Sequence, residues 1–168
     1  MVKKLKFLLN DTEIDAEQPA HTTLLDFLRS FGQTGTKEGC ASGDCGACTV
    51  LVRDCDTGWQ TINACIAPLG RVAGKQVITV EGLADAGNLH PVQQALVDHN
   101  ASQCGFCTPG FVMSLVALVE NDTPAERERV VGGIAGNLCR CTGYRPIVAA
   151  GLEVLSHPLD KLLLPDLP

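Results

Sequence analysis

The chain has 168 residues, of which 45% are hydrophobic and only 4% aromatic, and its net charge is −6 at pH 7. This length predicts one domain or two small ones with aliphatic cores, and the acidic balance without a basic run argues against nucleic acid as a partner. No stretch approaches about 18 apolar residues, so we expect no membrane insertion. The first apolar segment is too short for an export signal, which predicts a cytoplasmic protein.

Several short segments in the first eighty residues have the apolar and β-branched pattern of strands. We expect five strands, over residues 3–9, 12–16, 48–53, 59–63 and 76–80. Thr22–Thr23, followed by an apolar repeat that stops at Gly32, predicts one helix, and a second, short helix is expected near 64–69. Strands with one crossing helix are compatible with a β-grasp arrangement, although periodicity alone does not specify it.

The loop before the third strand holds a group of cysteines. Cys40, Cys45 and Cys48 form a C-x4-C-x2-C array, and Cys65 follows at a distance. This is the plant-type spacing for a [2Fe–2S] cluster. Glycines lie between these cysteines, and glycine lets a backbone curl tightly around a small inorganic core because it takes positive φ without a Cβ clash. The spacing therefore predicts an iron–sulfur site in this loop.

Nine cysteines is a high count for a chain without an export signal. They fall into tight groups, which favours metal ligation under reducing conditions over disulfides. Since nine is odd, one cysteine is spare. Cys55 lies in a turn-like stretch, Asp-Cys-Asp-Thr-Gly, and is the cysteine that we expect not to be a ligand.

After about residue 83 the strand signals stop and helix signals replace them. We expect four helices, over residues 91–99, 111–120, 124–136 and 146–155. The third is predicted from Thr123-Pro124-Ala125-Glu126, which has the pattern of a capping box with proline at the first helical position. Four helices joined by short turns predict a small bundle, and the last dozen residues, with three prolines, predict an extended tail.

A second group of cysteines lies at the ends of these helices. Cys104 and Cys107 are at the join between the first two helices, and Cys139 and Cys141 are at the join between the last two. The two turns would bring four thiolates to one end of the bundle, where the positive ends of two helix dipoles favour the thiolate form. Either an iron–sulfur cluster or a structural zinc ion, which also takes four cysteines, accounts for this set.

Five blocks of sequence resemble the iron–sulfur part of the molybdenum hydroxylases, and xanthine dehydrogenase-like members above all. The blocks are residues 35–40, 43–50, 89–94, 102–111 and 136–147. They occur in the family's order, and the resemblance covers residues 3 to about 155. It is less specific for the substrate, because oxidisers of aldehydes, carbon monoxide and N-heterocycles are similar in these blocks.

The resemblance implies an α+β fold with two domains and two [2Fe–2S] clusters. An N-terminal β-grasp, plant-ferredoxin-like domain would span residues 1–82, and a C-terminal four-helix bundle domain with the tail would span residues 83–168. The first cluster's ligands would be Cys40, Cys45, Cys48 and Cys65. The second cluster's ligands would be Cys104, Cys107, Cys139 and Cys141.

The resemblance also implies partners. Gln103 and Cys141 match positions that contact the pterin of a molybdenum cofactor, which a large partner subunit binds. Electrons would pass from molybdenum through the Cys104 set and then the Cys40 set to FAD on a further subunit or domain. A flavin domain often follows this region, so the FAD would lie on a separate chain, or the sequence would be a fragment. We expect a dimer of heterodimers or heterotrimers that acts in purine catabolism.

This chain would conduct electrons and carry out no substrate chemistry itself. The four histidines are scattered, no nucleophile–base pair is evident, and no Gly-x-Gly-x-x-Gly fingerprint for FAD is present. Arg140, between two ligands, is either a charge partner for the cluster or an interface residue. Three alternatives stay open: a related aldehyde, carbon monoxide or N-heterocycle dehydrogenase, a zinc-bearing interaction module, and a free-standing two-cluster ferredoxin.

Overall fold

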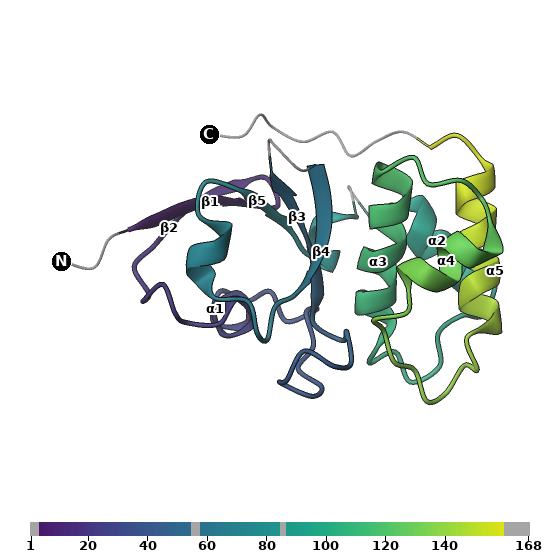
Figure 1. The fold of residues 1–168 in the computed structure, drawn as a ribbon, viewed down its shortest axis with the longest axis horizontal. Coiled ribbons are helices and arrows are strands. Elements are labelled where there is room, and N and C mark those ends of the chain that lie inside the picture. The colour runs from purple at the N-terminus through teal and green to yellow at the C-terminus, as the bar shows by residue number, and fades with distance from the viewer. Residues whose placement is uncertain (1–3, 55–57, 85–86, 160–168) are drawn as a thin grey trace.

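The computed structural model describes residues 4–54, 58–84 and 87–159, and its fold is α+β. Five strands form one mixed sheet in the order β2-β1-β5-β3-β4 (Figure 1). The strands are β1 (Leu5–Leu9), β2 (Thr12–Ala16), β3 (Thr49–Asp54), β4 (Gly58–Asn63) and β5 (Gln76–Ile78). β1 and β5 pair in parallel, while the other neighbours are antiparallel. The five predicted strands are therefore confirmed, and the whole is consistent with a ferredoxin-like fold.

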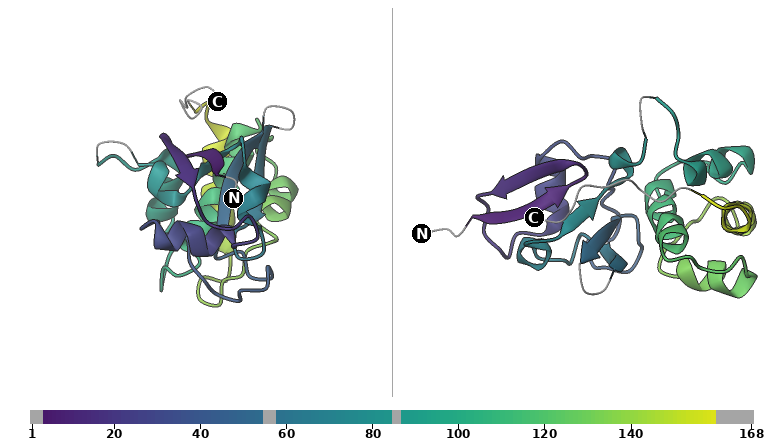
Figure 2. Two further views of the ribbon diagram at one scale, coloured as in Figure 1. Left: turned by 90° about the vertical axis from the view of Figure 1, so that its left-hand side faces the viewer. Right: turned by 90° about the horizontal axis from the view of Figure 1, so that it is seen from above.

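Helices lie on both sides of the sheet. Helix α1 (Leu24–Ser30) packs on one face, and a layer of four helices packs on the other (Figure 2). That layer contains α2 (Pro91–Asp98), α3 (Thr108–Glu120), α4 (Arg127–Gly133) and α5 (Arg145–Ser156). Two short 3₁₀ helices, η1 (Leu69–Val72) and η2 (Val80–Gly82), flank β5. Helix α3 lies directly against β3 and β4, so it is the helix that joins the layer to the sheet.

Strand β3 is buried on both faces, which explains its continuous apolar sequence. Successive side chains of a strand point to opposite faces. Val50 and Val52 pack in the core shared with α1, whereas Leu51 packs in the core shared with the four-helix layer. The same alternation places Val77 of β5 on the first side and Ile78 on the second. Two cores therefore share one sheet as their common wall.

The prediction of a short helix near 64–69 is wrong, because the backbone of this segment forms hydrogen bonds with α1. The carbonyl groups of Ala64 and Ala67 accept hydrogen bonds from the amides of Leu25 and Leu24, at the start of α1. Those carbonyls are thus not available to a local helix. Pro68 also disfavours helical geometry in the residue before it. The segment forms turns instead, and the 3₁₀ helix η1 begins only at Leu69.

The third helix of the layer is shorter than expected at both ends. Its N-cap is Glu126, and no side chain caps it, so the predicted capping box at Thr123 does not form. The amide of Glu126 donates to the Pro124 carbonyl in a tight turn instead. At the other end the helix stops at Gly133, in a glycine pair with low helix propensity. Helix α3 begins at Thr108, three residues before its predicted start, and the remaining helices lie close to their predicted bounds.

None of the helices within the described ranges is both long and apolar enough to cross a membrane. Cys55 and most of the expected C-terminal tail lie outside the described residues.

Candidate metal centres

The first set of cysteines is brought together by the loop before β3 and the turn after β4. Cys40 and Cys45 are half-buried, whereas Cys48 and Cys65 are buried beneath them. The backbone amide of Cys65 donates to Cys48 Sγ at 3.4 Å, and the thiol of Cys45 interacts with that of Cys40. The four thiols thus form two pairs, an outer pair and an inner pair.

Backbone amides point at the outer thiol pair. The amides of Ser42 and Asp44 donate to Cys40 Sγ at 3.5 and 3.3 Å. The Ser42 backbone, with its side chain and Cys45, lowers the pKa of Cys40 to about 6. A Cβ on Gly39 would lie 2.8 Å from Cys45 Sγ, so only glycine leaves room for the sulfur at this position. This loop therefore favours a thiolate at its outer edge.

Cys65, in the inner pair, behaves in the opposite way to Cys40. Burial, followed by the neighbouring Cys48, raises the pKa of Cys65 to about 11. Four thiolates cannot collect here without a compensating positive charge, and metal ions supply that charge when they bind deprotonated sulfur. The donor set therefore fits a cationic metal centre better than four free thiols.

The second set lies at the N-terminal ends of two helices, as expected. Cys104 and Cys107 precede α3, and Cys139 and Cys141 precede α5. The Cys104 thiol raises the pKa of Cys141, and these two residues form an exposed pair. Burial, with a contribution from Cys139, raises the pKa of Cys107 to about 12. Cys107 and Cys139 form the inner pair, so this set repeats the arrangement of the first.

Hydrogen-bond donors surround Cys139. Thr142 donates to its sulfur twice, from the backbone amide at 3.4 Å and from the hydroxyl at 3.2 Å. Burial opposes ionisation, but hydrogen bonds from Thr142, with smaller contributions from Cys141 and Cys107, together outweigh it and lower the pKa of Cys139 to about 7. The Cys139 amide in turn donates to the Tyr144 hydroxyl at 2.9 Å. The role of Thr142 had no signal in the sequence beyond its place beside two cysteines.

The two sets lie next to each other, at the same end of the molecule (Figure 1). The amide of Leu138 donates to the carbonyl of Cys45 at 2.9 Å, which connects a residue beside Cys139 to a cysteine of the first set. Next to it the side chain of Asn137 donates to the carbonyl of Gly46 at 3.0 Å. A single backbone hydrogen bond thus joins Cys45 to the residue that directly precedes Cys139.

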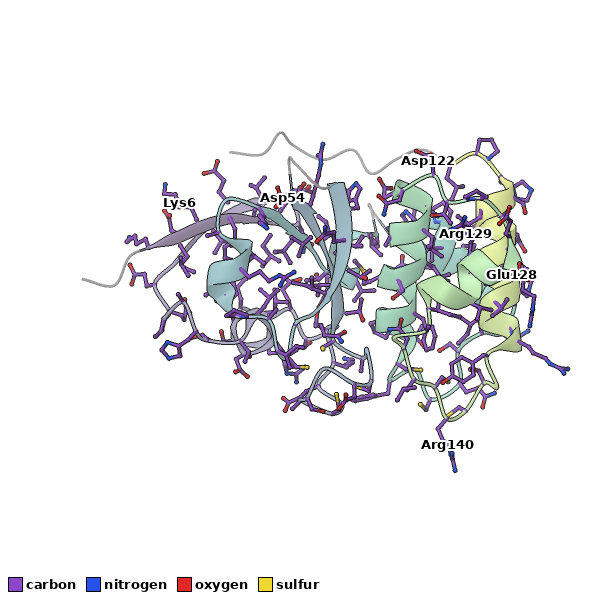
Figure 3. The ribbon with its side chains drawn as sticks, in the orientation of Figure 1. Lys6, Asp54, Asp122, Glu128, Arg129 and Arg140 are labelled. Carbon is purple, nitrogen blue, oxygen red and sulfur yellow. The ribbon has the colours of Figure 1, made fainter. Side chains whose placement is uncertain are left out.

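Two other candidate residues lie on the outside, whereas His90 is buried. Gln103 and Arg140 are exposed, and Arg140 points away from the ribbon at the end that carries the cysteine loops (Figure 3). This position is compatible with an interface role for Arg140. His90 caps α2, since its ring accepts from the amide of Val92 and its own amide donates to Gln93.

Among residues 4–54, 58–84 and 87–159, no three His, Cys, Asp or Glu side chains form a ready site for a single metal ion. The thiols pair off two by two in both sets, with amide or hydroxyl donors aimed at Cys40, Cys48 and Cys139.

Two family models match this chain in succession. A model described as "2Fe-2S iron-sulfur cluster binding domain" matches residues 7–70, and one described as "[2Fe-2S] binding domain" matches residues 79–152. Each model covers one of the two cysteine sets that the structure brings together.

Known proteins resemble the chain over nearly its whole length. Xanthine dehydrogenase of Emericella nidulans is 53% identical over 159 residues, which is 90% of this chain and 12% of that protein. The structure of aldehyde oxidoreductase from Desulfovibrio gigas has a TM-score of 0.83 and 39% identity, over 93% of this chain and 17% of that one. A chain of quinoline 2-oxidoreductase from Pseudomonas putida 86 has a TM-score of 0.79 and 34% identity, over 91% of this chain and 95% of that one.

The chain thus spans about an eighth of the xanthine dehydrogenase that it matches, but nearly all of the quinoline 2-oxidoreductase chain. The likeness runs through both domain models and both cysteine sets. The chain therefore belongs to the xanthine dehydrogenase and aldehyde oxidoreductase family of molybdenum hydroxylases, of which it is the iron–sulfur part.

Proposed function

We propose that the chain holds two [2Fe–2S] clusters and conducts electrons from a molybdenum centre on one partner to FAD on another. The ligands of the first cluster are Cys40, Cys45, Cys48 and Cys65. The ligands of the second are Cys104, Cys107, Cys139 and Cys141. The observation that carries this proposal is that a [2Fe–2S] domain model spans each of the two cysteine sets that the fold gathers. When bound, each cluster exchanges one electron at a time.

The pairing of thiols within each set supports two-iron clusters over the zinc alternative. A zinc ion needs four sulfurs around one point, each at about 2.3 Å, whereas two irons need two separate pairs of thiolates. Both sets have such pairs: Cys40 with Cys45, and Cys104 with Cys141, on the outside. The amides and the hydroxyl that donate to thiol sulfurs are also the groups by which a protein tunes the potential of a cluster.

The chain's own part is to hold the two sets close together and to connect them. The hydrogen bond from Leu138 to the Cys45 carbonyl provides a short connection between the two ligand loops. Since all eight thiolates would be bound to iron, none would be left free to attack a substrate. The chain therefore acts as a conductor between partners.

The cysteine end of the molecule has the features of a docking surface. Large apolar side chains beside both sets are exposed: Ile66 by 60%, Phe106 by 47% and Leu138 by 57%. Exposed apolar groups around a polar site mark contact surfaces. We therefore infer that the exposed edge at Gln103 and Cys141 contacts the pterin of the molybdenum cofactor on a large subunit, as the resemblance implies.

The remaining features of the proposal follow the family. We infer a ferredoxin-like domain over residues 1–82 and a four-helix bundle domain over residues 83–168, in a cytoplasmic complex built as a dimer of heterodimers or heterotrimers. The 53% identity to a xanthine dehydrogenase favours an N-heterocyclic purine as the substrate of the complex. Aldehyde oxidation is the second candidate, because the structure is similar to an aldehyde oxidoreductase with a TM-score of 0.83.

Metal and sulfide analysis of the purified chain tests the proposal. Two binuclear clusters require about four irons and about four labile sulfides per chain, with a red-brown colour and two EPR signals after reduction. Cys45→Ser should halve both contents and remove one signal. Cys55→Ser, at the cysteine that we expect to be spare, should leave all of them unchanged.

A colourless protein with bound zinc and no labile sulfide would refute the proposal and support the interaction module instead. A chain with two clusters that purifies from its host without larger partners would instead support the free-standing ferredoxin.

A further inference from the structure

We propose that Asn137 is a positioning residue that fixes the two ligand loops relative to each other. The inference rests on the proposed function, since it needs a cluster in each cysteine set. Asn137 lies two residues before Cys139 and is only 3% exposed. Its amide group is buried at the contact between the two loops, where no cysteine motif required a polar residue.

Both ends of the Asn137 side-chain amide form hydrogen bonds. Its Nδ2 donates to the carbonyl of Gly46 at 3.0 Å and lies 3.3 Å from Thr49 Oγ1. Its Oδ1 accepts a hydrogen bond from Ser114 Oγ at 2.7 Å. Gly46 lies between two cysteines of the first set, and Ser114 belongs to α3. One amide therefore joins the first ligand loop, the second ligand loop and the helix that packs on the sheet.

The network continues into the sheet and stiffens the first loop. Thr49 Oγ1 donates to the same Gly46 carbonyl at 2.7 Å. Asn63 of β4 donates to the carbonyl of Gly43 at 2.6 Å. Carbonyls on both sides of Cys45 are thus held by side chains of neighbouring elements. Because a buried polar group without a partner is costly, the arrangement in which Asn137 bonds all of its partners is favoured over arrangements that leave one of them unbonded.

Close packing at the same point leaves the loops little room to shift. Gly46 has φ of +68°, and a Cβ on it would overlap the carbonyl oxygen of Gly136. A Cβ on Gly110 of α3 would overlap the carbonyl oxygen of Gly46. The backbones of the two loops and of α3 therefore touch directly, and Asn137 supplies the directional bonds that select one arrangement of this contact.

The mutual splitting of the two EPR signals measures this positioning. Two nearby unpaired spins split each other's lines to an extent that depends on their separation and orientation. In the chain with both clusters reduced by dithionite, Asn137→Ala should reduce and broaden this splitting, while iron and sulfide contents stay at the wild-type level. Asn137→Asp, which keeps the shape but replaces the Nδ2 donor with an oxygen, should have the same effect.

Asn121→Ala is the matched control. Asn121 also crosses between the helical layer and the sheet, with Nδ2 donating to the Trp59 carbonyl at 3.2 Å, but at the other end of α3. Its loss should leave the splitting unchanged. If Asn137→Ala does not fold, Ser114→Ala carries the same test, since it removes only the hydrogen bond that orients the amide.

An unchanged splitting in the Asn137 variants, or in Ser114→Ala, with both clusters present would overturn the inference and leave the proposed function standing. A wild-type chain without two clusters would instead overturn the proposed function, and the inference with it.

Discussion

At the scale of single residues, Thr142 is a neutral residue that contacts a proposed ligand directly. Its hydroxyl and its amide both donate to Cys139 Sγ. Reduction adds a negative charge to a cluster, and a donor to a ligand sulfur stabilises that charge. The Thr142 hydroxyl therefore sets the second cluster to a higher potential than an apolar neighbour would.

Thr142→Val should lower the midpoint potential of the second cluster, because it removes the hydroxyl and keeps the shape. A lost hydrogen bond of about 1 kcal/mol corresponds to roughly 40 mV for a one-electron couple. Redox titration followed by EPR measures this potential, and the potential of the first cluster should not change.

Thr108→Val is the control for that substitution. Thr108 lies beside Cys107, but its hydroxyl is 2.8 Å from Ser102 Oγ. Thr108→Val should leave the midpoint potentials of both clusters unchanged. Equal shifts in the two variants would contradict a specific role for the Thr142 hydroxyl.

At the scale of elements, the first turn of α3 is shaped by its contact with the first ligand loop. Helices disfavour glycine, yet Gly110 is in the first turn of α3 and is buried against the carbonyl of Gly46. A side chain there would separate α3 from the loop. Gly110 therefore serves close packing at a cost in helix propensity.

Gly110→Ala should destabilise the protein by about 1–3 kcal/mol, since the added methyl group meets backbone that cannot move aside. Urea denaturation of the cluster-loaded chain measures this change.

Gly132→Ala in α4 is the matched comparison, because a Cβ there meets nothing within 4 Å. It should stabilise the protein by roughly 0.5–1 kcal/mol, the usual gain from replacing a helical glycine. The same sign for both substitutions would contradict the packing argument.

Local patterns in the sequence predict most of the elements. The strands and helices α1, α2, α3 and α5 follow from apolar periodicity and from prolines at helix starts. The two exceptions have different causes: residues 64–69 bond to α1, which is distant in the sequence, whereas the start of α4 follows a local turn at Pro124. No local propensity contains the partners of residues 64–69, because only the fold brings them together.

For the candidate site too, some features could be predicted from the sequence and others could not. Cysteine spacing and the family resemblance indicate which cysteines gather. The pairing of Cys40 with Cys45, and of Cys104 with Cys141, could not be predicted, because it depends on how the loops curl. Asn137 was missed as well, since a polar residue beside a cysteine motif looks like any loop residue until its burial is known.

At the scale of the whole molecule, the apolar cores reach the cysteine sets but are built mainly from other residues. Cys48 and Cys65 belong to the core beside α1, and Cys107 and Cys139 pack against the other core, whereas all other buried members of the two cores are aliphatic, aromatic or methionine. Both cores would persist without metal, so we expect the sheet and helices to fold in the apoprotein. The loops, which depend on bonds to thiol sulfur, should not be ordered to the same degree.

Removal of iron should therefore lower Tm without unfolding the chain. Each kcal/mol of stabilisation lost with the clusters corresponds to roughly 2–4 °C for a chain of this size. Hydrogen exchange followed by mass spectrometry should show faster exchange at residues 40–48, 102–108 and 137–144, with β3 and α3 still protected. Complete unfolding on iron removal would show instead that the clusters are required for the fold itself.

The shared sheet has a consequence for any attempt to divide the chain. Leu51 and Ile78 belong to strands of the N-terminal half, but their side chains pack in a core that consists mainly of residues from the helices of the C-terminal half. A polypeptide cut between residues 82 and 83 would leave this apolar surface bare in water, where it invites self-association. The ferredoxin-like half is thus built as an incomplete module, whose missing wall is supplied by the helices that carry the second pair of cysteine turns.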